Sequence, residues 1–222
     1  MTSKNLPEVL QYDFLNQSEI IDIKNKVFEL KSLWQDLRHT TEKDLSSNVI
    51  TTQMLSPGMY SRQHFAYMIS VKKFKPIMKE QFNTYYNKIK TKIEEVYNKP
   101  VIYLDKANYP GFHIYEMNEN QSVSKYDCYN FHKDNFSYLS QITTPGPIVS
   151  MIIPISLPVT GGSLLYKTSD VTTRFEYSEG MLAQWASQIL HSIEPFSLTQ
   201  NECRITMQMH LNIRENEIAI FW

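Results

Sequence analysis

The chain of 222 residues is 42% hydrophobic and 20% charged, the composition of an ordinary globular domain with a substantial core. Its net charge of −1 gives no reason to expect nucleic acid or a membrane surface as a partner. Two cysteines do not make a secreted disulfide framework, and neither an apolar signal core nor a membrane-spanning apolar run is present. We therefore expect a cytoplasmic protein.

The first hundred residues predict a mainly helical support. Residues 1–15 read as a loosely packed lead-in. From Ser18 to about Arg38, apolar residues recur every three or four positions, which predicts an amphipathic helix with Asn16 or Ser18 as its N-cap. Those apolar residues are Ile20, Ile23, Val27, Leu30, Trp34 and Leu37.

A second helix is expected after a loop. Residues 40–62 are rich in turn-forming types and indicate a loop with a short strand, and residues 63–71 are apolar enough for a strand. The second helix should run from about Pro76, a favourable first-turn residue, to Tyr97.

Beyond Pro100 the pattern changes to short strands separated by turns, which favours a double-stranded β-helix, or jelly roll. The fold class expected is an all-β core with flanking helices packed on one sheet. One domain is predicted, with support in residues 1–100, a jelly-roll core in 101–214 and an apolar tail in 215–222 that docks on the protein or on a second subunit in a homodimer. The predicted strands are 101–104, 111–117, 148–155, 163–166, 172–177, 181–185, 189–193 and 204–213.

The last of these strands alternates strictly between polar and apolar residues. Arg204, Thr206, Gln208, His210 and Asn212 share one face, which carries no acidic residue. That composition is unusual for a solvent-facing edge, so we expect the face to line the inside of the barrel. His210 could then contact substrate or a neighbouring residue. An equal alternative is that it is an interior histidine whose ring nitrogens form hydrogen bonds within the protein.

The stretch from Phe131 to Phe136 contains the strongest chemical signal. His132 and Asp134 are two residues apart, so on an extended strand their side chains leave the same face and can bind one metal ion. A third ligand must come from elsewhere, and His191 is the candidate. Two histidines and one carboxylate on one face of an ion are the arrangement of non-haem Fe(II) oxygenases.

The ordered set His132-x-Asp134, His191 and Arg204-x-Thr206 resembles the Fe(II)/2-oxoglutarate-dependent oxygenase superfamily. The resemblance covers about Val101 to Arg214. It implies that the first three residues bind Fe(II), that Arg204 and Thr206 hold the distal carboxylate of 2-oxoglutarate, and that O2 takes an open site on the metal. An alternative for Arg204 is a structural ion pair.

The stretch Asn108 to Glu116 resembles the group of this superfamily that hydroxylates or chlorinates free amino acids. The resemblance implies that Glu116 binds a substrate amine and that Arg62 binds its carboxylate. From the polar face of the last strand we expect Gln208 and His210 to line the same zwitterion pocket. Alternatively, Glu116 is an outward-facing strand residue. Relatives that chlorinate lack the metal-binding carboxylate, so the presence of Asp134 favours hydroxylation.

The function expected is therefore hydroxylation of an unactivated C–H bond of a small polar substrate, in the class of free amino acids or amino-acid-like molecules, with 2-oxoglutarate and O2 converted to succinate and CO2. Two alternatives remain open at this point. One is a metal-binding jelly roll of another activity, such as an isomerase, and the other is a binding module without catalysis.

Overall fold

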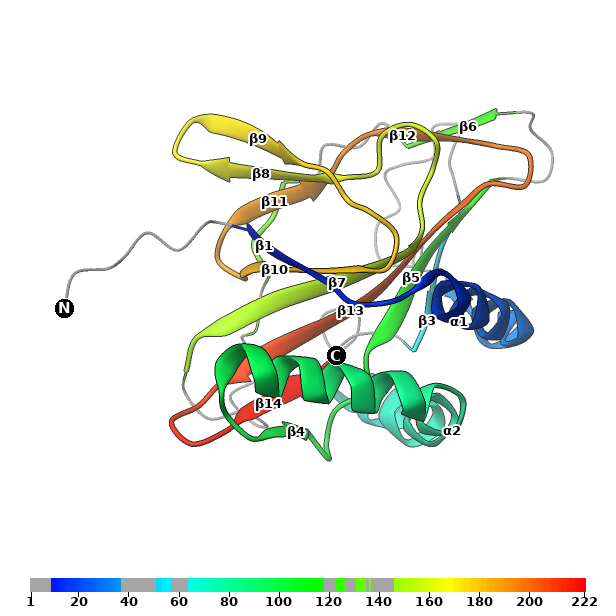
Figure 1. Ribbon diagram of the computed structural model, residues 1–222. Coiled ribbons are helices and arrows are strands. Elements are labelled where there is room, and N and C mark those ends of the chain that lie inside the picture. The colour runs from blue at the N-terminus through cyan, green and yellow to red at the C-terminus, as the bar shows by residue number, and fades with distance from the viewer. Residues whose placement is uncertain are drawn as a thin grey trace.

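The computed structural model describes residues 9–36, 51–56, 64–117, 123–126, 131–134, 136 and 146–222. It has a mostly β core with two α-helices (Figure 1), in agreement with the predicted class. All eight strands predicted beyond Pro100 are present, with bounds shifted by one or two residues. None of the described helices has an apolar stretch that could cross a membrane.

The main sheet contains nine strands in the order β1-β10-β7-β13-β5-β3-β2, and β14 connects β13 to β4. All of its pairings are antiparallel except that of β14 with β4. Its strands are β1 (Val9–Asp13), β2 (Gln35–Asp36), β3 (Thr51–Leu55), β4 (Val101–Tyr103), β5 (Gly111–Glu116), β7 (Ile148–Ser156), β10 (Met181–Ala186), β13 (Cys203–Ile213) and β14 (Ile218–Phe221).

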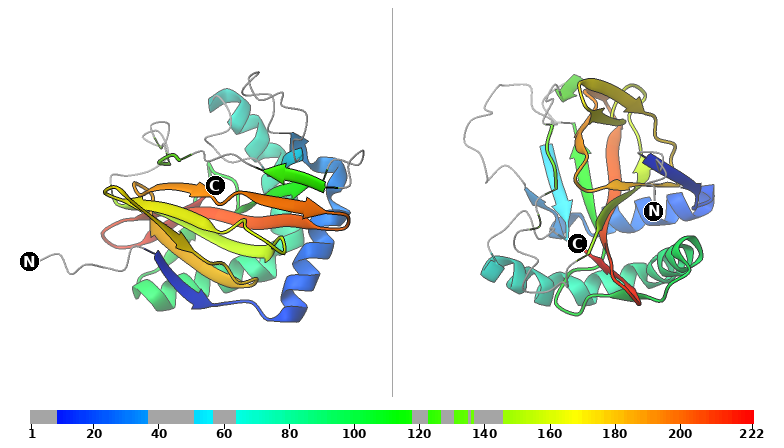
Figure 2. Two further views of the ribbon diagram at one scale, coloured as in Figure 1. Left: turned by 90° about the horizontal axis from the view of Figure 1, so that it is seen from above. Right: turned by 90° about the vertical axis from the view of Figure 1, so that its left-hand side faces the viewer.

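Two smaller sheets lie over one face of the main sheet, and the helices cover the other face (Figure 2). One small sheet has the order β11-β8-β9, and the other pairs β12 with β6. Apolar side chains from β8 and β12 pack onto β7 and β5, so the space between the layers forms a second core. The strands are β6 (Val123–Tyr126), β8 (Leu164–Thr168), β9 (Val171–Phe175), β11 (Leu190–Ile193) and β12 (Phe196–Thr199).

Helix α1 spans Gln17–Glu29 and begins at the predicted cap. The Asn16 side chain accepts a hydrogen bond from the Glu19 amide, and the Glu19 carboxylate accepts one from the Asn16 amide, which completes a capping box. The helix ends earlier than predicted, because the chain turns through a 3-10 segment, Lys31–Leu33, into β2. There the Trp34 indole N–H donates to the Val27 carbonyl oxygen, which holds the returning chain against the helix.

Helix α2 spans His64–Tyr97, so the prediction of a strand over residues 63–71 and of a helix beginning at Pro76 was wrong. Pro76 lies inside the helix, where its ring removes one backbone hydrogen bond. The helix continues through it because buried Tyr67, Val71, Phe74 and Met78 keep the three- and four-residue spacing across the proline. Packing of this face outweighs the local preference of a proline for the first turn.

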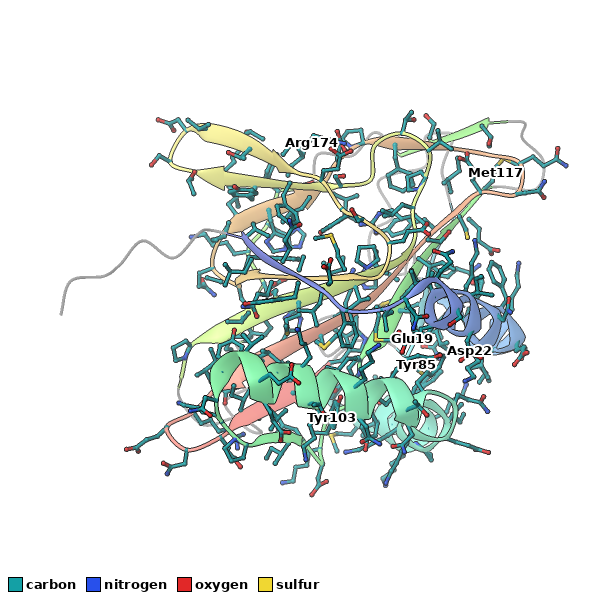
Figure 3. All side chains as sticks on the ribbon, in the orientation of Figure 1. Glu19, Asp22, Tyr85, Tyr103, Met117 and Arg174 are labelled. Atoms are coloured by element: carbon teal, nitrogen blue, oxygen red, sulfur yellow. The ribbon has the colours of Figure 1, made fainter. Side chains whose placement is uncertain are left out.

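Polar contacts join α1 to α2 at the edge of the helical layer (Figure 3). The Tyr85 hydroxyl donates to Asp22, at 2.6 Å, and Lys88 pairs with Glu19, also at 2.6 Å. Lys26 joins the same Asp22 carboxylate at 2.7 Å. These contacts fix the position of α1 on α2.

Strand β13 lies at the centre of the main sheet and has the predicted alternation. Ile205, Met207, Met209 and Leu211 are fully buried against the helices. The polar residues of the strand face the opposite side, toward the small sheets. Alternation of side chains along a strand is the cause, since one face meets the apolar helices and the other meets the interior between the layers.

The apolar tail docks on the chain's own sheet. Strand β14 pairs with β13 and β4, and Trp222 is 1% exposed. The Trp222 indole N–H donates to the Ser56 carbonyl oxygen at 2.7 Å. Gly111 has no room for a side chain here, because a Cβ atom on it would lie 2.2 Å from the Trp222 Nε1 atom.

Candidate metal centre

The backbone holds His132 and His191 side by side. Each residue's amide donates to the other's carbonyl oxygen at 2.9 Å, which forms an isolated antiparallel bridge between the segment 131–134 and β11. Directly opposed residues of an antiparallel pair present their side chains on the same face. The two imidazole rings accordingly lie 4.6 Å apart between centroids.

Asp134 completes the cluster. Its amide donates to the Ser187 carbonyl oxygen at 3.2 Å, and its Oδ1 atom lies 3.8 Å from Nε2 of His191. One ligand atom from each of His132, Asp134 and His191 lies within 4.8 Å of the others, so small side-chain rotations would bring all three onto one ion with bonds of about 2.1 Å. The predicted triad therefore exists as a spatial cluster.

His191 is prepared for metal binding by its surroundings. Its Nδ1 atom lies 2.9 Å from the Ile189 carbonyl oxygen, which can only accept, so Nδ1 carries the proton and Nε2 presents a lone pair. Burial lowers the pKa of His191, although the nearby Asp134 carboxylate works in the opposite direction. The Trp185 ring packs edge-on at 5.3 Å and limits the rotation of the imidazole. A neutral, oriented imidazole is the form that binds a metal.

The Asp134 carboxylate has partners that the sequence motif did not predict. The Ser150 hydroxyl on β7 donates to Oδ2 of Asp134, and it also contacts the Ser187 hydroxyl at 2.8 Å and Nδ1 of His210 at 3.2 Å. No motif marks the two serines. For Ser150, the alternation along β7 relative to buried Ile153 could have indicated an inward position.

Arg204 is the most deeply buried of the permanently charged side chains in the described part of the chain, with 1% of its surface exposed. Its Nε–H donates to the Gly162 carbonyl oxygen at 2.9 Å, and its guanidinium carbon lies 5.4 Å from the Tyr115 ring and 5.9 Å from the Phe196 ring. Its Nη1 atom has no hydrogen-bond partner within the described ranges. A buried cation with an unused donor is costly unless an anion binds it, so this position fits a carboxylate ligand.

The residues next to Arg204 are neutral. Thr206 is fully buried on the same face, and its hydroxyl accepts a hydrogen bond from Nε2 of Gln208 at 3.1 Å. The same Gln208 nitrogen lies 3.1 Å from Nδ1 of His113. Burial lowers the pKa of His113 to about 3, and the positive charge of Arg204 adds to this effect. His113 is therefore uncharged at neutral pH and adds no second positive charge beside Arg204.

The other predicted interior residues, Gln208 and His210, share the face of Arg204. Gln208 is the one residue between Cys203 and Asn212 that is not buried, so its side chain is partly accessible to solvent. His210 is buried, and its ring stacks on Trp222 at 5.7 Å. Burial lowers the pKa of His210 to about 4, which keeps it neutral. Their role in substrate binding stays a prediction.

The two remaining predicted residues do not join this cluster in the structure. Glu116 pairs in register with Cys203 and lies on the face of β5 that the helices cover, where its carboxylate binds Lys31 at 2.9 Å. Glu116 directly follows Tyr115 on the strand, so the two side chains point to opposite faces, and Tyr115 is the one that faces Arg204. The prediction that Glu116 binds a substrate amine is thus corrected by the strand register. Arg62 lies outside the described residues.

Comparison with solved structures identifies the fold. An α-ketoglutarate-dependent non-haem epimerase of nogalamycin biosynthesis, SnoN, aligns with a TM-score of 0.51 at 10% identity over 93% of this chain and 79% of that one. An oxidoreductase of the 2OG-Fe(II) oxygenase family from Burkholderia pseudomallei also aligns with a TM-score of 0.51, at 10% identity over 94% of this chain and 86% of that one. No protein-family model and no curated protein matches the sequence.

The alignments and the geometry agree. The chain has the fold of structures in the 2OG-Fe(II) oxygenase family, and it carries a His-Asp-His cluster that could hold a metal ion.

Proposed function

We propose that this protein is an Fe(II)/2-oxoglutarate-dependent dioxygenase with a jelly-roll core, and that it hydroxylates an unactivated C–H bond of a small polar substrate. The observation that carries the proposal is that two features occur together in the interior between the sheets. His132, Asp134 and His191 form the three-ligand cluster, and Arg204 supplies a buried guanidinium with an unused donor. A metal-binding jelly roll that uses no 2-oxo acid has no need of the second feature.

The protein's own residues have separate tasks in this proposal. The imidazoles of His132 and His191 and the carboxylate of Asp134 would hold the metal ion. Fe(II), when bound, supplies the activation of O2 that is coupled to oxidative decarboxylation of 2-oxoglutarate. Arg204 orients the cosubstrate by donating two hydrogen bonds to its distal carboxylate. The burial of Arg204 and Thr206 keeps water away from that contact.

Asp134 also bears on the outcome of the reaction. Its carboxylate would bind the metal where chlorinating relatives have no carboxylate, so we expect hydroxylation rather than chlorination. Incubation with chloride, 2-oxoglutarate and substrate should give no chlorinated product.

The substrate class that we propose is a free amino acid or a related zwitterion, in a single-domain cytoplasmic enzyme. The resemblance of residues 108–116 to amino-acid hydroxylases supports this class, and the partly accessible amide of Gln208 could contact a polar substrate. Glu116 does not supply the amine contact, because Lys31 binds its carboxylate on the other face of β5.

A screen with Fe(II) and 2-oxoglutarate tests the proposal. Each protein amino acid is added in turn, succinate is measured, and products are examined for a mass gain of one oxygen. Succinate that depends on substrate, together with that mass gain, is the expected result. Succinate without a mass change would indicate epimerisation, and no succinate with any substrate in a protein that binds iron would favour a binding module. The Arg204→Gln variant serves as the control in which iron is bound and 2-oxoglutarate is not.

A further inference from the structure

Three polar side chains form a hydrogen-bonded group next to the second carboxylate oxygen of Asp134. The group comes from three different strands or strand ends: Ser150 on β7, Ser187 directly after β10, and His210 on β13. Ser150 lies directly opposite His210 in the sheet, so both side chains leave the same face toward the interior. All three are at least nine-tenths buried, with exposed fractions of 3%, 0% and 5% in the order given. The Ser150 hydroxyl is the centre, since it contacts Oδ2 of Asp134, the Ser187 hydroxyl and Nδ1 of His210.

The number of protons in this group fixes the direction of each hydrogen bond. An ionised carboxylate only accepts, so the single Ser150 proton goes to Oδ2 of Asp134. The Ser150 oxygen has two lone pairs left, and its other two neighbours must donate to them. Ser187 therefore donates its hydroxyl proton at 2.8 Å, and His210 donates from Nδ1 at 3.2 Å. The hydroxyl of Ser150 then makes one donated and two accepted bonds, its full capacity.

The consequence for Asp134 concerns which oxygen faces the metal ligands. Oδ1 lies 3.8 Å from Nε2 of His191, whereas Oδ2 is occupied by Ser150. A carboxylate held at one oxygen cannot rotate freely to offer both oxygens to an ion. Residues that orient a metal-binding group in this way commonly change metal affinity by about 10- to 100-fold when they are removed.

We propose that Ser150, with its hydroxyl directed by the Nδ1–H group of His210, is a positioning residue that holds Oδ2 of Asp134 and leaves Oδ1 as the single metal-binding oxygen. The proposal rests on the proposed function in that it takes the cluster to be a metal site. It assigns to His210 a supporting role through Ser150 and a defined tautomer, with the proton on Nδ1.

Two sets of variants test the assignment. Ser150→Ala removes the hydroxyl that holds Oδ2. Ser70→Ala is the matched control, because Ser70 is also buried, lies on α2 and makes no side-chain hydrogen bond within the described residues. His210→Asn and His210→Leu form a second pair, whose new side chains have the same number and branching of heavy atoms. Asparagine can place an N–H group where Nδ1 of the histidine lies, and leucine cannot.

The probe is Co(II), titrated into metal-free protein and followed by calorimetry and by its visible absorption bands. Ser150→Ala should bind Co(II) about 10- to 100-fold more weakly than the parent and should show shifted bands, because the carboxylate is free to bind through both oxygens. Ser70→Ala should bind like the parent. His210→Leu should weaken binding in the same direction, and His210→Asn should recover most of the loss.

The outcomes separate this inference from the proposed function. Parent-like Co(II) affinity and bands in Ser150→Ala, or equal affinities for His210→Asn and His210→Leu, would overturn the positioning role while leaving the oxygenase proposal intact. If the parent binds Co(II) and the variants behave as expected but Fe(II) supports no turnover of 2-oxoglutarate, the positioning role stands and the oxygenase proposal fails.

Discussion

Removing the charge of Arg204 should abolish tight binding of 2-oxoglutarate while leaving the metal site intact. The Arg204→Gln variant keeps a long polar side chain that can still donate to the Gly162 carbonyl oxygen, which accepts from the Nε–H group of the parent at 2.9 Å. It removes the permanent positive charge and the unused Nη1 donor. The fold should therefore survive, and the effect should fall on the ligand.

The size of the effect follows from the burial of the site. A carboxylate held by a guanidinium in this position makes two charge-assisted hydrogen bonds, each worth about 1.5–3 kcal/mol. Loss of both costs about 3–6 kcal/mol, which raises the dissociation constant of 2-oxoglutarate roughly 10²- to 10⁴-fold. Arg204→Lys keeps the charge but loses the paired N–H donors of the guanidinium, so the dissociation constant of 2-oxoglutarate should rise by an intermediate factor of about 10- to 150-fold.

Anaerobic calorimetry of 2-oxoglutarate with the Fe(II)-loaded protein measures these constants. Iron affinity should change by less than about threefold, because Arg204 is not among the three ligands. The matched control is Arg174→Gln on β9, which breaks a partly exposed ion pair with Glu194 and should leave 2-oxoglutarate binding unchanged. An unaltered dissociation constant in Arg204→Gln would refute the assignment of this residue as the cosubstrate anchor.

The other predictions concern the metal, the corrected residue and pH. His191→Ala should lose Fe(II) binding by at least about 100-fold, measured by anaerobic titration, and parent-like iron content would contradict the ligand set. Glu116→Gln should leave turnover and substrate affinity unchanged within about twofold, because its carboxylate binds Lys31 on the helical face; a large loss of substrate affinity would contradict that placement. The pKa of His113 is about 3 when folded and about 6.5 when unfolded, so the unfolded state binds more protons below pH 6.5 and stability falls as pH falls toward 3. The free energy of unfolding of the metal-free protein should drop by about 2 kcal/mol between pH 7 and pH 5 from this residue alone. Urea unfolding measures this free energy at both pH values. In His113→Gln the drop between pH 7 and pH 5 should be smaller by that amount, and an equal drop in the variant and the parent would contradict the prediction.

The sequence determined the features that depend on local periodicity. Strict alternation in β13 identified one polar and one apolar face, because a strand between two different environments must separate its side chains in this way. The cap of α1 was also predictable, since Asn16 and Glu19 have the spacing of a capping box. The cluster of His132, Asp134 and His191 was predictable, because two imidazoles and a carboxylate in this order are typical of a metal-binding site.

The tertiary structure alone decided the features whose local signal is ambiguous. Strand β5 is buried or half-buried on both faces, so its residues do not alternate in polarity and only pairing with β13 shows that Glu116 faces the helices. The start of α2 is a short apolar run, which fits a strand or a helix equally well until it packs against β14 and neighbouring segments. Ser150 carries no motif, and it became part of the site because β7, β10 and β13 bring residues distant in sequence to one carboxylate. Such contacts arise from long-range strand pairing, which no local pattern specifies.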